Sequence, residues 1–351
     1  MEIEHKRTRL LQSLSRTWVV QRLKGIDLSV VPRWLYPLGS TETRYQHSLG
    51  VGRLSLLISN GIESDQLLLT AAAVLHDVGN GPFPHISDSL MEEMLGFKHE
   101  GAVRFAFENS AVRDSLILQE YGLDLDEISS VIKGGHSLTP FVNGHVDLDN
   151  VDNVYRFIST IPEAPLGIPS YSPSEIVRHM SLETKQIKIP EELKARFYSD
   201  RQKIYRYLWE NRLNMIAWTM LGRAIRIQRH TLTAEFLRMT NREAYRVIGL
   251  KLPGLTKALK NKEFKIVLDK KYRLLRGEGR KLLDNVNLGK LEGEFCSAAG
   301  LKDWQLGVTV AHLPIGEKRD HWRVYLVVHQ SNSKAKEILE DALSSSATTA
   351  A

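Results

Sequence analysis

The ten residues HDVGNGPFPH, at positions 76–85, constrain the fold of this chain more than any other stretch. They follow the apolar run LLLTAAAVL (67–75), so His76 and Asp77 end a segment suited to a protein interior. An unpaired carboxylate is costly to bury or becomes protonated, so Asp77 needs a cation or several hydrogen-bond donors. Glycine and proline then predict a turn that folds the chain back over this helix end and brings His85 with it.

The composition is that of an ordinary globular chain. At 351 residues it is long enough to bury a sizeable core, and its charged and apolar fractions do not predict disorder. No apolar stretch reaches the roughly 18 residues of a membrane span, and the charged start MEIEHKRTRLLQSLSR does not resemble a secretory leader. The single cysteine, Cys296, excludes an internal disulfide and fits a reducing compartment. We therefore expect a cytoplasmic protein with no membrane attachment.

Helical periodicity dominates the first 250 residues. The sequence predicts Ser87 and Asp200 as helix N-caps, and a proline-rich surface excursion at 162–175. The expected helices cover His47–Asn60, Asp65–Val78, Ser87–Met94, Glu100–Phe107, Leu125–Lys133, Asp149–Thr160, Ser174–His179, Asp200–Arg226 and Arg242–Gly249.

The pattern changes after about residue 255. WQLGVTVAHL and HWRVYLVVHQ alternate in the manner of strands, and PIGEKRD joins them into an expected hairpin, before a last helix at Lys334–Leu343. The expected fold is mainly α, a helical bundle with a small C-terminal α+β extension. Its expected parts are a lead-in (1–34), a helical body (35–250), the extension (255–345), with an assembly or regulatory role, and a disordered tail (346–351).

A basic stretch lies in the extension. Ten Lys and Arg residues stand against three acids between Lys257 and Lys281. Such a run is most often a solvated face, and the alternative is an anion-facing patch for nucleotide phosphates, nucleic acid or an acidic partner. Its few aromatic residues do not predict a platform for stacking single-stranded nucleic acid.

Three further segments supply partners for His76 and Asp77. His47, in RYQHSLG, begins the preceding helix, and two antiparallel helices would bring it to the same end as His76. In GHVDLDNVDNVYR, Asp149 leads an inward-facing series, although Asp147 or Asp152 remains an alternative as the ligand. Two imidazoles and two carboxylates suit one divalent ion, whether Mn, Fe, Co, Ni, Zn or Mg.

Taken together, these motifs resemble the HD-domain metal-dependent phosphohydrolases, and most closely their deoxynucleoside triphosphate triphosphohydrolase branch. The resemblance rests on Arg44–Gly50, His76–His85, the pair His99-Glu100 and Asp147–Asn153, which occur in the family's order. It runs over residues 35 to 160 and continues faintly to about 250. It implies that His47, His76, Asp77 and Asp149 hold the metal ion, and that the protein forms homo-oligomers.

The resemblance also implies roles around the ion. Arg44 and, in a looser match, Arg212 would bind the phosphates, while His85, Asp88, His99 and Glu100 would lie beside the scissile bond. Residue types agree with this chemistry, because a histidine can protonate a departing oxygen and an arginine can stabilise phosphoryl charge. Gly79, Gly81 and Pro82 would form the turn that closes over the ion.

Three positions depart from the family pattern. Asn80 stands where the triphosphohydrolases carry a histidine, and an amide cannot shuttle a proton at neutral pH. Asn153 and Phe157 replace the tyrosine and the aspartate that hold the sugar, so Asn153 is the candidate at that substrate position.

The sequence therefore predicts an enzyme that hydrolyses nucleotides, and specifically (d)NTPs to nucleoside and triphosphate. The enzymatic alternative is a phosphatase of nucleoside monophosphates or another small phosphoester. The non-enzymatic alternative is a nucleotide sensor that keeps the ion and has lost turnover through Asn80.

Overall fold

The computed structural model describes residues 2–36, 39–108, 112–161, 166–275, 287–314 and 319–330. Helices make up most of these residues, and a small antiparallel sheet lies near the C-terminus, which confirms the predicted mainly α fold. In the described part of the chain, no helix has the length and apolar character needed to cross a bilayer. The predicted helix Lys334–Leu343 and the tail lie outside the described residues, as do 276–281 of the basic stretch.

The chain divides into two compact units. The first comprises Met1–Ile204 and Thr233–Arg242, and the second comprises Tyr205–Leu232 and Glu243–Ala351. The first unit contains α1 (Glu2–Leu14), α2 (Trp18–Arg22), η1 (Leu23–Gly25), α3 (Arg44–Leu56), α4 (Glu63–Leu75), α5 (Asp88–Leu95), η2 (His99–Gly101), α6 (Val103–Glu108), α7 (Val112–Glu120), α8 (Leu125–Lys133), α9 (Thr139–Val142), α10 (Leu148–Thr160), α11 (Pro173–Val177), β1 (Met180–Ser181), β2 (Gln186–Ile187), most of α12 (Glu191–Glu210) and α14 (Ala234–Leu237).

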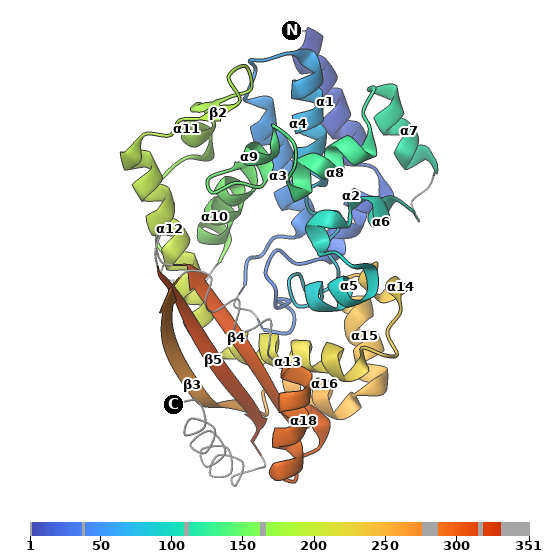
Figure 1. The fold of residues 1–351 in the computed structure, drawn as a ribbon, viewed down its shortest axis with the longest axis vertical. Coiled ribbons are helices and arrows are strands. Elements are labelled where there is room, and N and C mark those ends of the chain that lie inside the picture. The colour runs from blue at the N-terminus through green and yellow to red at the C-terminus, as the bar shows by residue number, and fades with distance from the viewer. Residues whose placement is uncertain are drawn as a thin grey trace. The chain divides into compact units, whose positions relative to one another are not determined.

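Helix α4 is the centre of the first unit. It packs against α1, α3, α8 and α9, and α10 packs on the other side of α3 (Figure 1). Every residue from Gln66 to Leu75 is buried, which explains why this helix is apolar around most of its circumference. Arg7 of α1 is also buried and joins three segments, because it donates to the Ile58 carbonyl at 2.8 Å and to Gln66 and Thr70 at 3.0 Å.

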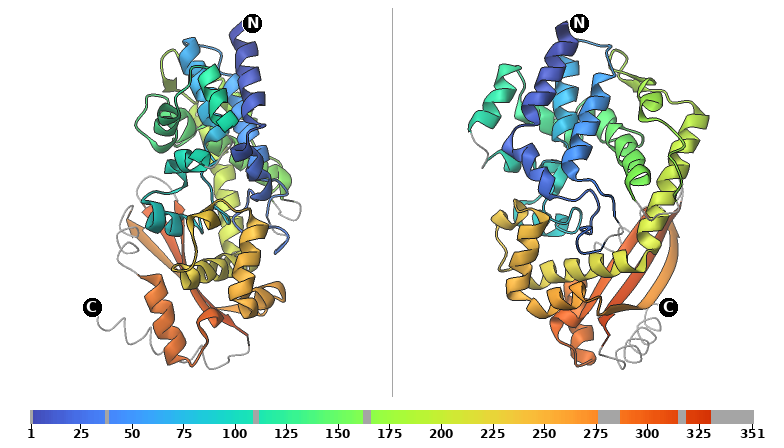
Figure 2. Two further views of the ribbon diagram at one scale, coloured as in Figure 1. Left: turned by 90° about the vertical axis from the view of Figure 1, so that its right-hand side faces the viewer. Right: turned by 180° about the vertical axis from the view of Figure 1, so that it is seen from behind.

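The second unit is built on a three-stranded antiparallel sheet. Its strands are β3 (Phe264–Leu275), β4 (Leu306–Pro314) and β5 (Arg319–His329) in the order β3-β5-β4, so the predicted hairpin of β4 and β5 is confirmed. Its helices are α13 (Arg212–Gln228), α15 (Asn241–Lys251), α16 (Pro253–Lys260), α18 (Leu288–Ala298) and η3 (Asp303–Gln305). Helices α13 and α18 pack against β4 (Figure 2).

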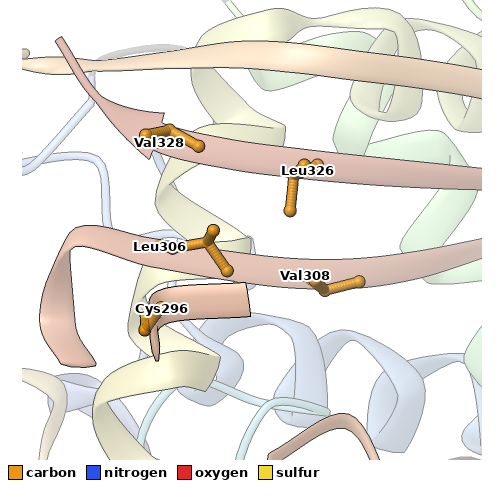
Figure 3. Close-up of a cluster of buried hydrophobic side chains, with 5 residues drawn as sticks. All are labelled: Cys296, Leu306, Val308, Leu326 and Val328. Carbon is orange, nitrogen blue, oxygen red and sulfur yellow. The ribbon is translucent and has the colours of Figure 1, made fainter. Parts of the chain in front are cut away.

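Two kinds of contact hold the second unit together. Cys296 of α18 packs with apolar side chains of β4 and β5, among them Leu306 and Leu326 (Figure 3). Beside this core the fully buried Glu292 accepts hydrogen bonds from Arg223 at 2.8 Å and Arg226 at 2.9 Å. A buried carboxylate is tolerated here because two guanidinium groups pair with it.

The structure corrects two sequence predictions, and it confirms Ser87 as the N-cap residue of α5. The expected helix Asp200–Arg226 is two helices, because Asn211 interrupts it and caps α13 by accepting a hydrogen bond from the Asn214 amide. Asp200 is not an N-cap, since it lies inside α12 and accepts from the Ser170 amide at 2.6 Å. Ser87 does precede α5, but its hydroxyl makes no capping hydrogen bond.

The basic stretch also contains an element that was not predicted. Its residues from Phe264 onward form β3, an edge strand paired along its length with β5. Val267 and Lys270 interrupt the alternation that would have revealed a strand. Charged residues such as Lys265 and Lys270 are common on edge strands because they discourage further pairing.

Candidate metal centre

Two helix ends bring the predicted histidines together. Helix α3 begins after Thr43 in a capping box with Gln46, which places Arg44 and His47 in its first turns. Helix α4 ends at Leu75 with His76 as its C-cap residue, and Asp77 follows directly. Because α3 and α4 pack side by side, the start of one helix lies beside the end of the other.

Four side chains converge between these helix ends and the start of α10. The Nε2 atoms of His47 and His76 lie 3.2 Å apart. Asp149 Oδ1 is 2.8 Å from His47 Nε2 and 3.6 Å from His76 Nε2. Asp77 Oδ2 is 3.8 Å from His47 Nε2 and 3.5 Å from His76 Nε2. Ligand atoms of one ion bonded at about 2.1 Å stand roughly 3.0–3.5 Å apart, so these donors fit a single divalent ion.

The other nitrogen of each imidazole is already engaged. His76 Nδ1 lies 2.9 Å from the Ala73 carbonyl oxygen, which can only accept, so this nitrogen carries a hydrogen. His47 Nδ1 lies 2.8 Å from Asp152 Oδ2. In the neutral form, both rings therefore direct an Nε2 lone pair into the cluster, where two facing lone pairs need a proton or a cation between them.

The electrostatics of the cluster favour a bound cation. Burial alone would lower the pKa of His47, but hydrogen bonds to Asp149 and Asp152 reverse this and raise the pKa to about 10. Burial alone would raise the pKa of Asp149, but its hydrogen bonds to both imidazoles hold this pKa well below the usual range. Burial, and next the Asp149 carboxylate, raise the pKa of Asp147 to about 7. Negative charge is therefore concentrated here, and protons on the imidazoles balance it.

The three aspartates at the start of α10 have separate positions. Asp147 caps the helix by accepting from the Asn150 amide at 2.6 Å, and it also accepts from the Gly144 amide at 2.6 Å. Asp149 points to the two imidazole Nε2 atoms, and Asp152 to the far nitrogen of His47. Of the three, Asp149 is the one whose oxygen lies among the converging donors.

Asp77 has the cation and the donors that the sequence required. Arg44 Nη1 lies 2.8 Å from each of its two oxygens, and Asn80 Nδ2 lies 2.6 Å from Oδ1. Burial alone would raise the pKa of Asp77. The positive charge of Arg44 and of the two imidazoles outweighs this effect of burial and holds the pKa well below the usual range. Arg44 was predicted to bind phosphate, and in this structure it pairs with a candidate ligand. Asn80 Oδ1 is buried and has no hydrogen-bond partner among the described residues.

A second polar cluster follows the glycine-rich turn. Asp88, the first residue of α5, lies between two imidazoles: its Oδ1 is 2.9 Å from His99 Nδ1, and its Oδ2 is 3.4 Å from His85 Nδ1. Glu100 Oε2 is 3.5 Å from His99 Nδ1. His99 is buried while His85 is exposed, so the cluster runs from the interior to the surface. Its three ligand-type groups, His85, Asp88 and His99, could also hold an ion.

The turn itself is shaped by residues other than those expected. The positive φ angles fall on Phe83 (53°) and His85 (64°) rather than on Gly79 or Gly81. Gly79 is needed for close packing, because a Cβ there would overlap with the His99 carbonyl oxygen. Phe83 is held in place because its amide donates to Asn241 Oδ1 at 2.8 Å.

The remaining candidates make contacts of other kinds. Arg212 belongs to the second unit, where its guanidinium donates to the Ile266 carbonyl at 3.4 Å, and its phosphate-binding role stays a prediction. Asn153 Oδ1 is buried, and within the described part of the chain it has no hydrogen-bond partner. Phe157 is a buried core residue. The predicted roles of Asn153 and of the polar cluster likewise stay predictions.

Sequence reasoning missed Glu42, Arg156 and Gly50 as neighbours of the centre. Arg156 pairs with both Asp152 and Glu42, and a Cβ on Gly50 would overlap with Asp152 and Arg156. The pairing of Arg156 with Asp152 could have been predicted from the sequence, because the two residues are four positions apart in a helix. Gly50 ends the motif Arg44–Gly50, but that motif did not reveal its contact with Asp152, and no sequence pattern pointed to Glu42.

Comparisons with known proteins agree with this geometry. Residues 44–136 match the HD domain family, and they include His47, His76 and Asp77 of the cluster. The chain therefore carries an HD domain. It is 32% identical over 140 residues to the deoxynucleoside triphosphate triphosphohydrolase SAMHD1 of Gallus gallus, and 29% identical over 140 residues to that of Homo sapiens. It is also 31% identical over 132 residues to the uncharacterized protein YdhJ of Bacillus subtilis.

These similarities cover only part of each protein. The matches take in 35% of this chain and 23% of the Gallus gallus relative, 35% and 22% for that of Homo sapiens, and 36% and 37% for YdhJ.

The electrostatics of the centre predict that metal binding releases a proton. A pKa raised to about 10 keeps His47 protonated through neutral pH, and a metal ion must displace that proton. We expect Mn²⁺ affinity to rise by about tenfold per pH unit between about pH 6 and pH 8. Calorimetry in buffers of different ionisation enthalpy measures the protons released. Affinity that is independent of pH would contradict this reading.

Proposed function

We propose that this protein is a metal-dependent phosphohydrolase of nucleotides that cleaves (d)NTPs to nucleoside and triphosphate. The observation that carries the proposal is the convergence of His47, His76 and Asp149 on one point, with an Asp77 oxygen 3.5 Å from His76 Nε2 and the Nδ1 atom of each imidazole already engaged. One divalent ion, Mn, Fe, Co, Ni, Zn or Mg, is the proposed cofactor, and it would supply an activated water and draw charge from a phosphoryl oxygen.

The residues beside the centre suit the other requirements of this reaction. His85 and His99 share the Asp88 carboxylate, which orients both rings, and the hydrogen bond to His99 favours the protonated form of that residue. Either histidine can then give a proton to the departing oxygen, and Glu100 adds a second carboxylate next to His99. Arg44 lies at the edge of the ligand set, where its guanidinium would neutralise a phosphate once the ion satisfies Asp77.

The choice of a nucleotide substrate has two supports. The chain is similar over part of its length to proteins named deoxynucleoside triphosphate triphosphohydrolases. The motifs that carry the resemblance occur in the order expected for that branch. Asn80, Asn153 and Phe157 leave the sugar and the number of phosphates open. Since Phe157 is buried in the core, it offers no polar contact to a sugar, which keeps a phosphatase of nucleoside monophosphates or another small phosphoester as the alternative.

Product analysis tests the proposal and separates these alternatives. Purified protein would be incubated with each of Mn²⁺, Mg²⁺, Co²⁺, Ni²⁺ and Fe²⁺ and with panels of NTPs, dNTPs and NMPs, and the products separated by chromatography. We expect nucleoside and intact triphosphate in equal amounts, because attack at the phosphorus next to the sugar leaves the three phosphates joined. The His76→Ala/Asp77→Ala variant, which lacks half of the ligand set, should give neither product.

Other outcomes would replace the proposal. Nucleoside and inorganic phosphate from NMPs would identify a phosphatase. Nucleotide binding without turnover under any metal would identify a sensor, and Asn80→His would then be the variant to test for restored turnover.

The Asp88 cluster gives a pH prediction. Burial alone would lower the pKa of His99, but the hydrogen bond to Asp88 reverses this and raises that pKa. A raised pKa keeps the acid form present to higher pH, so activity should fall only as the pH rises through it. Asp88→Asn removes the charge and should move this basic limb of kcat/KM to lower pH by about one unit or more. Glu100→Gln, a more distant and exposed carboxylate, is the matched control with a smaller shift. An unmoved limb in Asp88→Asn would remove His99 as the acid.

Assembly and location are further parts of the proposal. The resemblance favours a homo-oligomer, and the single cysteine favours a reducing, cytoplasmic location. The basic stretch on α16 and β3 is proposed as a site for an effector nucleotide, and nucleic acid is the alternative partner.

A further inference from the structure

Asp152 lies against a metal-ligand candidate without itself reaching the centre. Its Oδ2 is 2.8 Å from His47 Nδ1. An imidazole presents Nδ1 and Nε2 on opposite sides of its ring, and His47 Nε2 is the atom near His76 and Asp149. The ring therefore stands between Asp152 and the converging donors, so Asp152 can act on the centre only through His47.

Asp152 is itself held by a chain of charges. Arg156, one helical turn later on α10, pairs with Asp152 and also with Glu42, which lies just before α3. All three side chains are mostly buried. The exposed fractions are 8% for Asp152, 16% for Arg156 and 22% for Glu42. The alternating charges fix the orientation of the carboxylate, because Asp152 cannot turn away from His47 without losing Arg156.

The backbone of α3 leaves space for this arrangement. Gly50 lies one turn after His47, and a Cβ at this position would overlap with both Asp152 and Arg156. Its neighbours are side chains rather than backbone, so a larger residue would displace the carboxylate from His47 more readily than it would unfold the helix.

We propose that Asp152, anchored by Arg156 and Glu42 and admitted by Gly50, is a positioning residue that fixes the tautomer and orientation of His47 for metal binding. The carboxylate accepts the Nδ1 hydrogen, leaves the Nε2 lone pair facing the centre and increases the basicity of the ring. This inference rests on the proposed metal centre, and it assigns to Asp152 a role distinct from that of a ligand.

Substitutions at Asp152 separate its two contributions. Asp152→Asn keeps an acceptor for the Nδ1 hydrogen and removes the charge, whereas Asp152→Ala removes both. Loss of such a partner lowers metal affinity by about 10- to 100-fold, so we expect the alanine variant near the upper end and the asparagine variant near the lower end. The affinity for Mn²⁺ is measured from free Mn²⁺ by electron paramagnetic resonance, with no substrate present.

Asp147→Asn is the matched control. Asp147 is as buried as Asp152 and belongs to the same helix start, but its oxygens bond to the Gly144 and Asn150 amides and to no imidazole. Asparagine can still cap α10. The Mn²⁺ affinity of this variant should therefore stay close to that of the wild type, whereas the affinity of Asp152→Ala should fall. Gly50→Ala is a second route to the same effect, and it should weaken Mn²⁺ binding while Asp152 remains present.

These Mn²⁺ affinities distinguish a wrong role for Asp152 from a wrong metal centre. If the wild-type protein binds no Mn²⁺, the metal centre itself is wrong. If the wild type binds Mn²⁺ and Asp152→Ala, Asp152→Asn and Gly50→Ala bind it equally well, the centre stands and the role of Asp152 is overturned. Thermal melting of each metal-free variant, followed by circular dichroism, identifies any variant that has not folded. If the Asp152 variants do not fold, the Mn²⁺ affinity of Gly50→Ala decides whether Asp152 positions His47.

Discussion

The burial of the Asp77 carboxylate is the constraint on which the rest of the first unit depends. Only 4% of the Asp77 side chain is exposed, and the carboxylate is surrounded by Arg44, Asn80 and two imidazoles. Each of these partners comes from an element that must be held in register: α3 for Arg44 and His47, and the end of α4 and the turn after it for His76 and Asn80. The buried contacts of Arg7, which joins α1 to α4 and to the segment after α3, help to keep these helices aligned.

The centre concentrates acidic groups beyond what packing alone requires. Burial, together with the neighbouring Asp149, raises the pKa of Asp147 to about 7, while the imidazoles carry protons that a cation would replace. Such an arrangement suits the binding of an ion, because a cation can take the place of those protons between the carboxylates. The second cluster is of a different kind, since His85, Asp88 and His99 form a pair of imidazoles around one carboxylate.

The sequence predicted those parts of this arrangement that depend on local order. The apolar run before His76, the position of His47 near the start of the preceding helix and the hairpin of β4 and β5 all follow from periodicity, and the structure has them. It did not predict that Arg44 pairs with Asp77, or that Phe83 and His85 adopt positive φ, because tertiary packing decides both. Glu42 and Gly50 were missed for the same reason: their contacts join residues about a hundred positions apart. Asn211 was overlooked because a single cap residue divides an otherwise continuous helical pattern.

The most direct test of the central claim is anomalous diffraction at the manganese absorption edge from crystals soaked in Mn²⁺. We expect one strong peak per chain, within bonding distance of His47 Nε2, His76 Nε2 and oxygens of Asp77 and Asp149, and the loss of that peak in His76→Ala/Asp77→Ala. A peak at His85, Asp88 and His99 with none between the helix ends, or a peak that remains in the double variant, would contradict it.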